Sequence, residues 1–245
     1  MYSIRLEPAR KNAPLRIVWV HGWRSTGKSM LPLAGSFLNQ TENYLVDLPG
    51  FGKSPAPTFA YSSEDYADCV ADLIKSLPPR KTALAGHSAG GRIVIAAAKK
   101  YPEIIQGIIL IGGAGIPPRR PPLLKFYIWL VGTLSPAVKK IFPFLRDVTL
   151  RTADHRMVSG IMREILIKLI NEDLRNVAKS LDIPALLIYG DRDEVTPPYM
   201  GHSYNELIRN SALRIIRGAN HIGLLTDFTA EIHHHINAFL RENLC

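Results

Sequence analysis

The strongest chemical signal in the sequence is Ser88, which stands in the pentapeptide Gly-His-Ser-Ala-Gly at residues 86–90. A short apolar run at 82–85, typical of a strand, comes before it, and a helix-like stretch at 92–100 follows it. On a sharp strand-to-helix turn the serine hydroxyl is exposed, and side chains two positions before and after it would collide, so both positions need glycine. The start of the helix also favours negative charge beside the serine. The pattern predicts a nucleophilic serine.

A nucleophilic serine needs a base and a third group that orients the base. His221 follows the last predicted strand, at 213–216, and can serve as the base. The strand predicted at 185–189 ends in an acidic turn that carries two carboxylates, Asp191 and Asp193. Serine, aspartate and histidine follow one another in the order that acyl hydrolases use on parallel sheets, and each comes at the carboxyl end of a strand. Together the three positions predict acyl-transfer chemistry.

The elements that must position these residues are short apolar runs alternating with helix-like stretches, as in parallel strands covered on both faces. The predicted strands are 17–20, 44–46, 82–85, 108–111, 185–189 and 213–216, and the helix-like stretches are 30–38, 63–76, 89–100, 199–209 and 224–240. This alternation predicts the α/β class with a mostly parallel, doubly wound sheet. From 113 to 180 the pattern changes to Pro-rich turns and amphipathic helices, which predicts a helical insertion after the strand at 108–111.

With these motifs the chain resembles the α/β-hydrolase superfamily, in its capped, esterase- and lipase-like branch. The matching segments are His21-Gly22-Trp23, Asp-Leu-Pro-Gly-Phe-Gly-Lys-Ser at 47–54, residues 86–91, Gly190-Asp191-Arg192-Asp193 with Pro197, and His221. One departure is Asn220, where the family commonly has glycine before the histidine. The resemblance implies a hydrolase core at 1–112 and 181–245 and a helical cap, or lid, at 113–180.

The resemblance also assigns roles to individual residues. It implies that Asp193 is the acid of the catalytic triad, with Asp191 on the same turn as the alternative. It implies that the backbone N–H groups of Trp23 and Ala89 form the oxyanion hole, and the Trp23 indole is expected to shape the acyl pocket. For His21 a buried structural role is favoured over catalysis.

The net charge of +9 raises nucleic acid, anionic membranes and acidic substrates as partners. The charge is uneven, because residues 113–180 hold 12 Lys and Arg against 5 Asp and Glu, while the rest of the chain holds 18 against 16. The same segment is rich in aromatic residues, of which Phe126 and Trp129 are candidates for the substrate pocket. One interpretation is an apolar pocket under a basic rim that takes hydrophobic or anionic esters, with transient contact to a membrane surface. The other is a solvated basic helix face.

Composition excludes several other classes of protein. With 245 residues, 47% of them hydrophobic, the chain is long and apolar enough to form one α/β domain without a stabilising disulfide or metal ion. The same apolar content excludes a disordered chain. The two cysteines, Cys69 and Cys245, form no disulfide framework. With neither a signal peptide nor a membrane-length apolar run, the sequence is expected to be cytoplasmic. The run His233-His234-His235 points around a helix, so neither a metal site nor a cofactor is expected.

Two other function classes can be written on the same residues. Residues 22–29 satisfy the phosphate-loop pattern G-x-x-x-x-G-K-[ST], and Asp-Leu-Pro-Gly at 47–50 mimics a GTPase element. However, no base-recognition motif follows, and this reading leaves Ser88, Asp193 and His221 without a role. Nucleic-acid binding is the third class, but no recognisable binding module is present, so no nucleic-acid partner is expected.

The expected function is therefore a serine hydrolase that cleaves a carboxylic ester or thioester through Ser88, Asp193 and His221 and an acyl-enzyme. Cleavage of a C–C bond or an amide, or perhydrolysis, would use the same three residues, and the sequence does not separate these reactions. Serine at position 88 argues against epoxide hydrolysis and haloalkane dehalogenation, for which this superfamily uses a carboxylate nucleophile. The oligomeric state and the natural substrate are left open.

Overall fold

The structure is a computed structural model that describes residues 1–6, 13–117 and 159–244. A sheet runs through it with the strand order β1-β3-β2-β4-β5-β6-β7. The strands are β1 Tyr2–Leu6, β2 Leu15–Val20, β3 Thr41–Asp47, β4 Lys81–His87, β5 Gly107–Ile111, β6 Ala185–Gly190 and β7 Ser211–Ile216. Strand β1 pairs with β3 in antiparallel fashion and all the other neighbours are parallel. The predicted α/β class with a mostly parallel sheet is confirmed.

The six predicted strands correspond to β2–β7, whereas β1 was not predicted. Strands β2, β3, β5 and β6 are buried along their whole length, and β5 and β6 accordingly read as continuous apolar runs. By contrast, β1 lies at the edge of the sheet, only partly buried, and its sequence Tyr-Ser-Ile-Arg-Leu alternates in polarity. A five-residue edge strand of this kind has a weak sequence signal.

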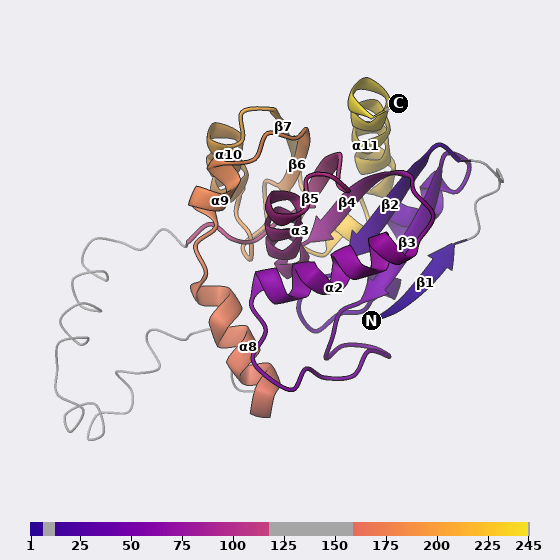
Figure 1. The fold of residues 1–245 in the computed structure, drawn as a ribbon. Helices are drawn as coiled ribbons and strands as arrows, with labels where there is room; N and C mark the ends of the chain where they lie inside the picture. The colour runs from indigo at the N-terminus through magenta and orange to yellow at the C-terminus, as the bar shows by residue number, and fades with distance from the viewer. Residues whose placement is uncertain (7–12, 118–158, 245) are drawn as a thin grey trace, which may run out of the picture.

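Helices cover both faces of the sheet, as a doubly wound fold requires (Figure 1). They are α1 Leu31–Ala34, α2 Ser63–Ser76, α3 Ala89–Lys100, α8 Gly160–Asn171, α9 Arg175–Lys179, α10 Pro198–Leu207 and α11 Thr229–Asn243, with 3-10 turns at Gly27–Met30, Gly35–Phe37 and Gly223–Leu225. One apolar core joins the sheet to α2, α3, α8, α9 and α10, and a second joins its other face to α1 and α11.

The helix-like stretch predicted at 30–38 is not one helix. It is broken into the four-residue helix α1 and two 3-10 turns that flank it. Gly35 follows α1 directly, and glycine disfavours the interior of a helix because its backbone loses the most freedom there. The apolar residues of the stretch still face the core, since Met30, Leu33 and Phe37 are fully buried.

The described part of the predicted insertion, 113–117 and 159–180, contains helices α8 and α9 and no strand. Its two ends meet beside the sheet, because the N–H of Leu174 donates to the carbonyl of Gly115. Two buried tyrosines hold the outgoing end: the Tyr189 hydroxyl donates to the carbonyl of Gly113 at 2.6 Å and the Tyr204 hydroxyl to that of Ala114 at 2.9 Å. Most of the predicted cap, with Phe126 and Trp129, lies outside the described residues.

Helix α8 is tied to helices α2 and α3 by polar contacts of the residue that follows it, Glu172. The Glu172 carboxylate accepts hydrogen bonds from the backbone N–H and the hydroxyl of Ser63, at the start of α2. The Arg92 guanidinium of α3 donates to the Glu172 carbonyl at 3.0 Å. Figure 1 shows α8 extending past the first turn of α2, on the side of the sheet that α2 and α3 cover. The returning arm of the insertion is therefore anchored on two core helices.

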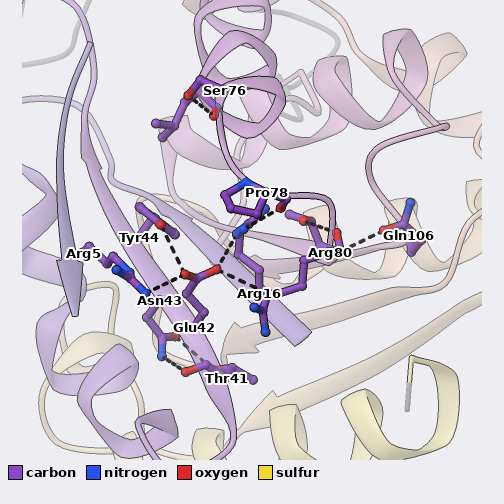
Figure 2. A network of polar contacts seen from close by, with 12 residues as sticks. Arg5, Arg16, Thr41, Glu42, Asn43, Tyr44, Ser76, Pro78, Arg80 and Gln106 are labelled. Atoms are coloured by element: carbon purple, nitrogen blue, oxygen red, sulfur yellow. Dashed lines mark hydrogen bonds and ion pairs between the residues drawn. The ribbon is translucent and has the colours of Figure 1, made fainter. Parts of the chain in front are cut away.

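A buried ionic network lies at the amino ends of the parallel strands β2 and β3 (Figure 2). The predicted catalytic residues follow the opposite, carboxyl ends of the parallel strands. Its centre is Glu42 at the start of β3, which is 5% exposed. Its carboxylate lies 2.9 Å from Nε of the buried Arg16, 3.1 Å from Arg5 and 3.5 Å from Arg80. The Tyr44 hydroxyl donates to it at 3.3 Å. The network joins β1, β2, β3 and the segment before β4.

No helix within the described ranges is both long enough and apolar enough to cross a membrane.

Candidate active site

Ser88 lies between β4 and α3 with a backbone conformation that L-amino acids rarely adopt, φ 54° and ψ −120°. The turn is tightly enclosed. A Cβ atom on Gly86 would lie 2.6 Å from the Gly90 carbonyl oxygen, and one on Gly90 would lie 2.4 Å from the Val20 carbonyl oxygen. Both distances are shorter than any real contact, so the two glycines have the steric role expected from the sequence. Strain of this kind persists only where the surroundings impose it, and it concentrates at functional sites.

His221 follows β7 and contacts the acidic turn after β6. Its Nδ1 lies 2.7 Å from Oδ2 of Asp193. Because a carboxylate only accepts hydrogen bonds, Nδ1 carries the proton, and in the neutral imidazole the lone pair is then on Nε2. This is the tautomer that a general base for a serine hydroxyl requires.

The Asp193 carboxylate is almost completely buried and fully hydrogen-bonded, with the residue 2% exposed. Besides His221, its oxygens accept the backbone N–H groups of Val195 and Thr196, both at 2.8 Å, and the Thr196 hydroxyl at 2.8 Å. Burial by itself raises the pKa of Asp193, but His221 and the hydrogen bonds of Thr196 outweigh it, so the pKa lies below its usual value. The carboxylate is therefore ionised at neutral pH.

Thr196 has a position in the site that the sequence analysis missed. Its hydroxyl lies 2.8 Å from Asp193 Oδ2 and 3.1 Å from His221 Nδ1, so it touches both members of the pair. A hydroxyl three residues after an aspartate commonly closes a local turn by bonding back to it. The spacing Asp193 to Thr196 carried this signal, but its meeting with His221 depends on the packing of two distant loops.

Asp191, the alternative acid, has a different contact. Its Oδ1 accepts the backbone N–H of Gly218 at 2.6 Å, and the side chain is exposed. It joins the turn after β6 to the turn after β7. Of the two carboxylates that the sequence left open, the structure places Asp193 against His221.

His87, the residue before Ser88, packs directly on His221. The two imidazole rings have centroids 4.6 Å apart and planes inclined by 38°, and Nε2 of His87 lies 3.2 Å from the backbone oxygen of His221. Burial, with a smaller effect of His221, lowers the pKa of His87 to about 3, so this ring is neutral. An uncharged His87 can support the loop of His221 without repelling a proton on its imidazole.

A pocket of about 410 Å³ brings the predicted residues together. Ser88, His87, His221 and Trp23 all line it. Trp23 is also packed edge-to-face on Phe51, with ring centroids 5.0 Å apart.

Ala89 is the first residue of α3, so its N–H has no partner within the helix. Within the described ranges the backbone N–H of Trp23 likewise has no hydrogen-bond acceptor. Both amides assigned to the oxyanion hole are therefore available as donors.

Comparison with known proteins agrees with this fold. The model of the alpha/beta hydrolase family matches residues 17–232. The chain belongs to this family. Uncharacterized hydrolase YugF of Bacillus subtilis is 26% identical to this α/β hydrolase over 228 residues, covering 84% of this chain and 83% of the relative. Pimeloyl-[acyl-carrier protein] methyl ester esterase of Chromobacterium violaceum is 26% identical and covers 90% and 93%.

Among solved structures, an esterase from Exiguobacterium antarcticum superimposes on this α/β hydrolase with a TM-score of 0.75. The alignment covers 98% of this chain and 95% of the esterase, at 21% sequence identity. At that identity the likeness shows the fold. The family assignment and the named hydrolases and esterases among its relatives make the chain an enzyme of the hydrolase class.

In this α/β hydrolase the phosphate-loop pattern at 22–29 has a structural explanation. The backbone N–H of Gly27, which would face a phosphate in a nucleotide site, donates to Oδ1 of Asp47 at 2.8 Å. The other oxygen of Asp47 accepts the N–H of Lys53 at 2.9 Å. The Asp47 carboxylate therefore holds two loops together. The following α1 has only four residues, too short for the helix that a phosphate loop needs.

Two other histidines of the hydrolase, His21 and His233, have structural contacts. His21 is fully buried, and its Nε2 accepts the N–H of Leu48 at 3.1 Å while Nδ1 lies 2.7 Å from the Gly22 carbonyl. Burial lowers its pKa, so the ring is neutral. In α11, His233 contacts the Ser36 hydroxyl at 2.7 Å. No cluster of three metal-ligating side chains is present in the part of the chain that the structure describes.

Proposed function

We propose that this α/β hydrolase is a serine esterase that cleaves a carboxylic ester with Ser88 as the nucleophile, His221 as the base and Asp193 as the group that orients the base. The observation that carries the proposal is the 2.7 Å contact of His221 Nδ1 with a buried, ionised Asp193, because His221 lines the same pocket as Ser88. The named esterases among the relatives support the choice of an ester bond.

The reaction follows from these positions. His221 Nε2 takes the proton of the Ser88 hydroxyl as Oγ forms a bond to the ester carbonyl carbon. The carbonyl oxygen becomes an oxyanion and accepts hydrogen bonds from the amides of Trp23 and Ala89, each worth about 3–4 kcal/mol in the transition state. The carbonyl then re-forms and the C–O bond to the alcohol breaks, and the alcohol leaves with the proton from His221.

Water completes the cycle by the same steps. His221 takes a proton from water as its oxygen attacks the acyl carbon, and the Ser88–acyl bond breaks as the proton returns to Oγ. The carboxylic acid is released and the enzyme is restored. The negative charge of Asp193 stabilises the imidazolium that forms twice in each turnover. Thioester and C–C bond cleavage and perhydrolysis would use the same nucleophile, and substrate panels distinguish them from ester cleavage.

The division into a core at 1–112 and 181–245 and a cap at 113–180 belongs to the same proposal. It is supported by the meeting of the two ends of the segment at Gly115 and Leu174 and by the absence of a strand from 113–117 and 159–180. A cytoplasmic location and contact of the basic cap with a membrane surface stay predictions from the sequence.

The test is hydrolysis of p-nitrophenyl esters together with covalent labelling by a fluorophosphonate probe. Ser88→Ala should abolish both turnover and labelling, because the probe reacts only with an activated serine. Ser203→Ala is the matched control, since this serine lies in α10 and its hydroxyl donates to the Tyr199 carbonyl. Unchanged turnover in Ser88→Ala would refute the proposal.

A further inference from the structure

The pocket that contains Ser88 also carries positive charge. Arg24 and Lys28 line it together with the hydroxyl groups of Ser25, Ser29 and Thr226. No aspartate or glutamate lines this pocket among the described residues. The reaction itself needs donors only at the oxyanion, so hydrolysis of a neutral ester does not require these two cations.

Lys28 lies in the 3-10 turn Gly27–Met30 and is exposed. It forms no ion pair with a described residue, whereas Lys100 pairs with Asp68 at 2.6 Å and Lys168 with Asp65 at 3.6 Å. Its position is fixed at the base, because the turn is held by the bond from the Gly27 N–H to the buried Asp47 carboxylate. A flexible ammonium on a rigid turn at the pocket is suited to meet an anion that enters the pocket.

Arg24 is placed by an unusual backbone conformation. Its φ is 55°, and Ser88 is the other non-glycine residue in the described ranges with a positive φ. The left-handed region is unfavourable for an L-residue, because its Cβ comes too close to the following carbonyl oxygen. The turn at Arg24 directly follows Trp23, so the same strained segment carries a proposed oxyanion donor and a cation that lines the pocket. Residues in such strained backbone conformations cluster at active sites and ligand-binding sites.

We propose that Lys28 and Arg24 form an anion subsite, and that the substrate is an ester that also carries a negatively charged group, a carboxylate or a phosphate. This rests on the proposed esterase function, because the subsite is defined by its place in the pocket of Ser88. The pocket volume of about 410 Å³ is in the range of small-molecule sites, so the reacting ester and the anion can occupy it together. The hydroxyl of Ser25, which also lines the pocket, supplies a further hydrogen-bond donor.

The experiment compares two substrates of equal chain length, mono-p-nitrophenyl adipate and p-nitrophenyl hexanoate, which differ in a terminal carboxylate. The measured quantity is the ratio of their kcat/KM values. Lys28→Met should lower this ratio about fivefold, as expected for loss of one partly solvated ion pair. Arg24→Asn, which keeps a residue that tolerates a positive φ, should lower it similarly. Added salt should reduce the ratio for the wild type, because it screens the attraction.

Lys179→Met is the matched control, since Lys179 is an exposed lysine in α9 that does not line the pocket; its ratio should equal that of the wild type. Competitive inhibition by adipate and by butyl phosphate distinguishes the two anions. An unchanged ratio in both variants, with no inhibition by either anion, would overturn the subsite while hydrolysis of the hexanoate and fluorophosphonate labelling of Ser88 still support the esterase. If the wild type neither hydrolysed the esters nor reacted with the fluorophosphonate probe, the proposed esterase function itself would be refuted.

Discussion

The hydroxyl of Thr196 is the contact by which the role of the Asp193–His221 pair can be tested without removing either member. It lies 2.8 Å from Asp193 Oδ2 and 3.1 Å from His221 Nδ1. Thr196→Val removes the hydroxyl and nearly preserves the shape of the side chain, while the backbone N–H of residue 196 still donates to Asp193 Oδ1. The change therefore perturbs the orientation of the imidazole and leaves Ser88, Asp193 and His221 in place.

The magnitude follows from the bonds that are lost and kept. A hydrogen bond to a charged group contributes about 1.5–3 kcal/mol, and each 1.4 kcal/mol is tenfold in rate, so full loss would lower kcat roughly 10- to 100-fold. Asp193 keeps two backbone N–H donors and His221. We therefore expect the lower end, about tenfold in kcat. The pKa of Asp193 should also rise towards its ordinary value, because one group that stabilises the anion is gone.

The assay is steady-state hydrolysis of p-nitrophenyl hexanoate, with kcat and KM separated and the thermal midpoint measured on the same samples. Thr82→Val is the matched control. Thr82 is fully buried at the start of β4, and its hydroxyl donates to the Arg80 carbonyl at 2.9 Å. That variant should lose about 1 kcal/mol of stability with kcat unchanged. If Thr196→Val lost only stability, as the control does, with kcat within about twofold of the wild type, the reasoning would be refuted.

Three further predictions concern Glu42, His87 and Asp193. Glu42→Gln removes the charge that compensates the buried Arg16, so the free energy of unfolding in urea should fall by about 3–5 kcal/mol. Glu103→Gln, on the surface, is the control and should leave this free energy almost unchanged. A loss below about 1 kcal/mol for Glu42→Gln would contradict the stabilising role of the network. His87→Phe should lower kcat about fivefold, and the pH profile of kcat between pH 5 and 9 should stay unchanged because the His87 ring is neutral there. His87→Gln keeps an N–H donor to the His221 carbonyl and should recover most of the lost kcat. An altered pH profile would argue that His87 titrates in this range. The pKa of Asp193 is lower in the folded state than in the unfolded state, so its ionised carboxylate stabilises the fold above the unfolded pKa of about 3.9, and this stabilisation is lost as the pH falls through the folded value. The difference in unfolding free energy between the wild type and Asp193→Asn should therefore shrink below about pH 4. A difference that stays constant with pH would contradict this prediction.

The parts of the site that could be predicted from the sequence are those fixed by local sterics and chain order. Gly86 and Gly90 are needed because backbone atoms of neighbouring segments come within 2.4–2.6 Å of where a Cβ would lie, and this constraint leaves a readable pentapeptide. The carboxyl ends of β4, β6 and β7 lie at one edge of a parallel sheet, which is why residues as distant as Ser88 and His221 could be expected in one pocket.

Other contacts could not be predicted, because they depend on how separate loops pack. The packing of His87 on His221 joins residues 134 positions apart in the sequence, and no local pattern indicates it. The three arginines around Glu42 come from separate segments, and nothing in their spacing indicates that they converge. Strand β1 was missed although it alternates in polarity, because an alternation of only five residues is a weak signal.

The acidic turn after β6 shows how environment separates two carboxylates that the sequence offers as equals. Asp191 is exposed and accepts one backbone N–H, from Gly218, so water screens its charge and its role is to join two turns. Asp193, two residues later, is 2% exposed and accepts three bonds from Val195 and Thr196 besides that of His221. A charge fixes an imidazole and stabilises its protonated form only where water cannot compete, and the backbone donors that hold Asp193 ionised also hold it in one orientation. Burial and hydrogen bonding, rather than the presence of a carboxylate, therefore select Asp193 as the partner of His221.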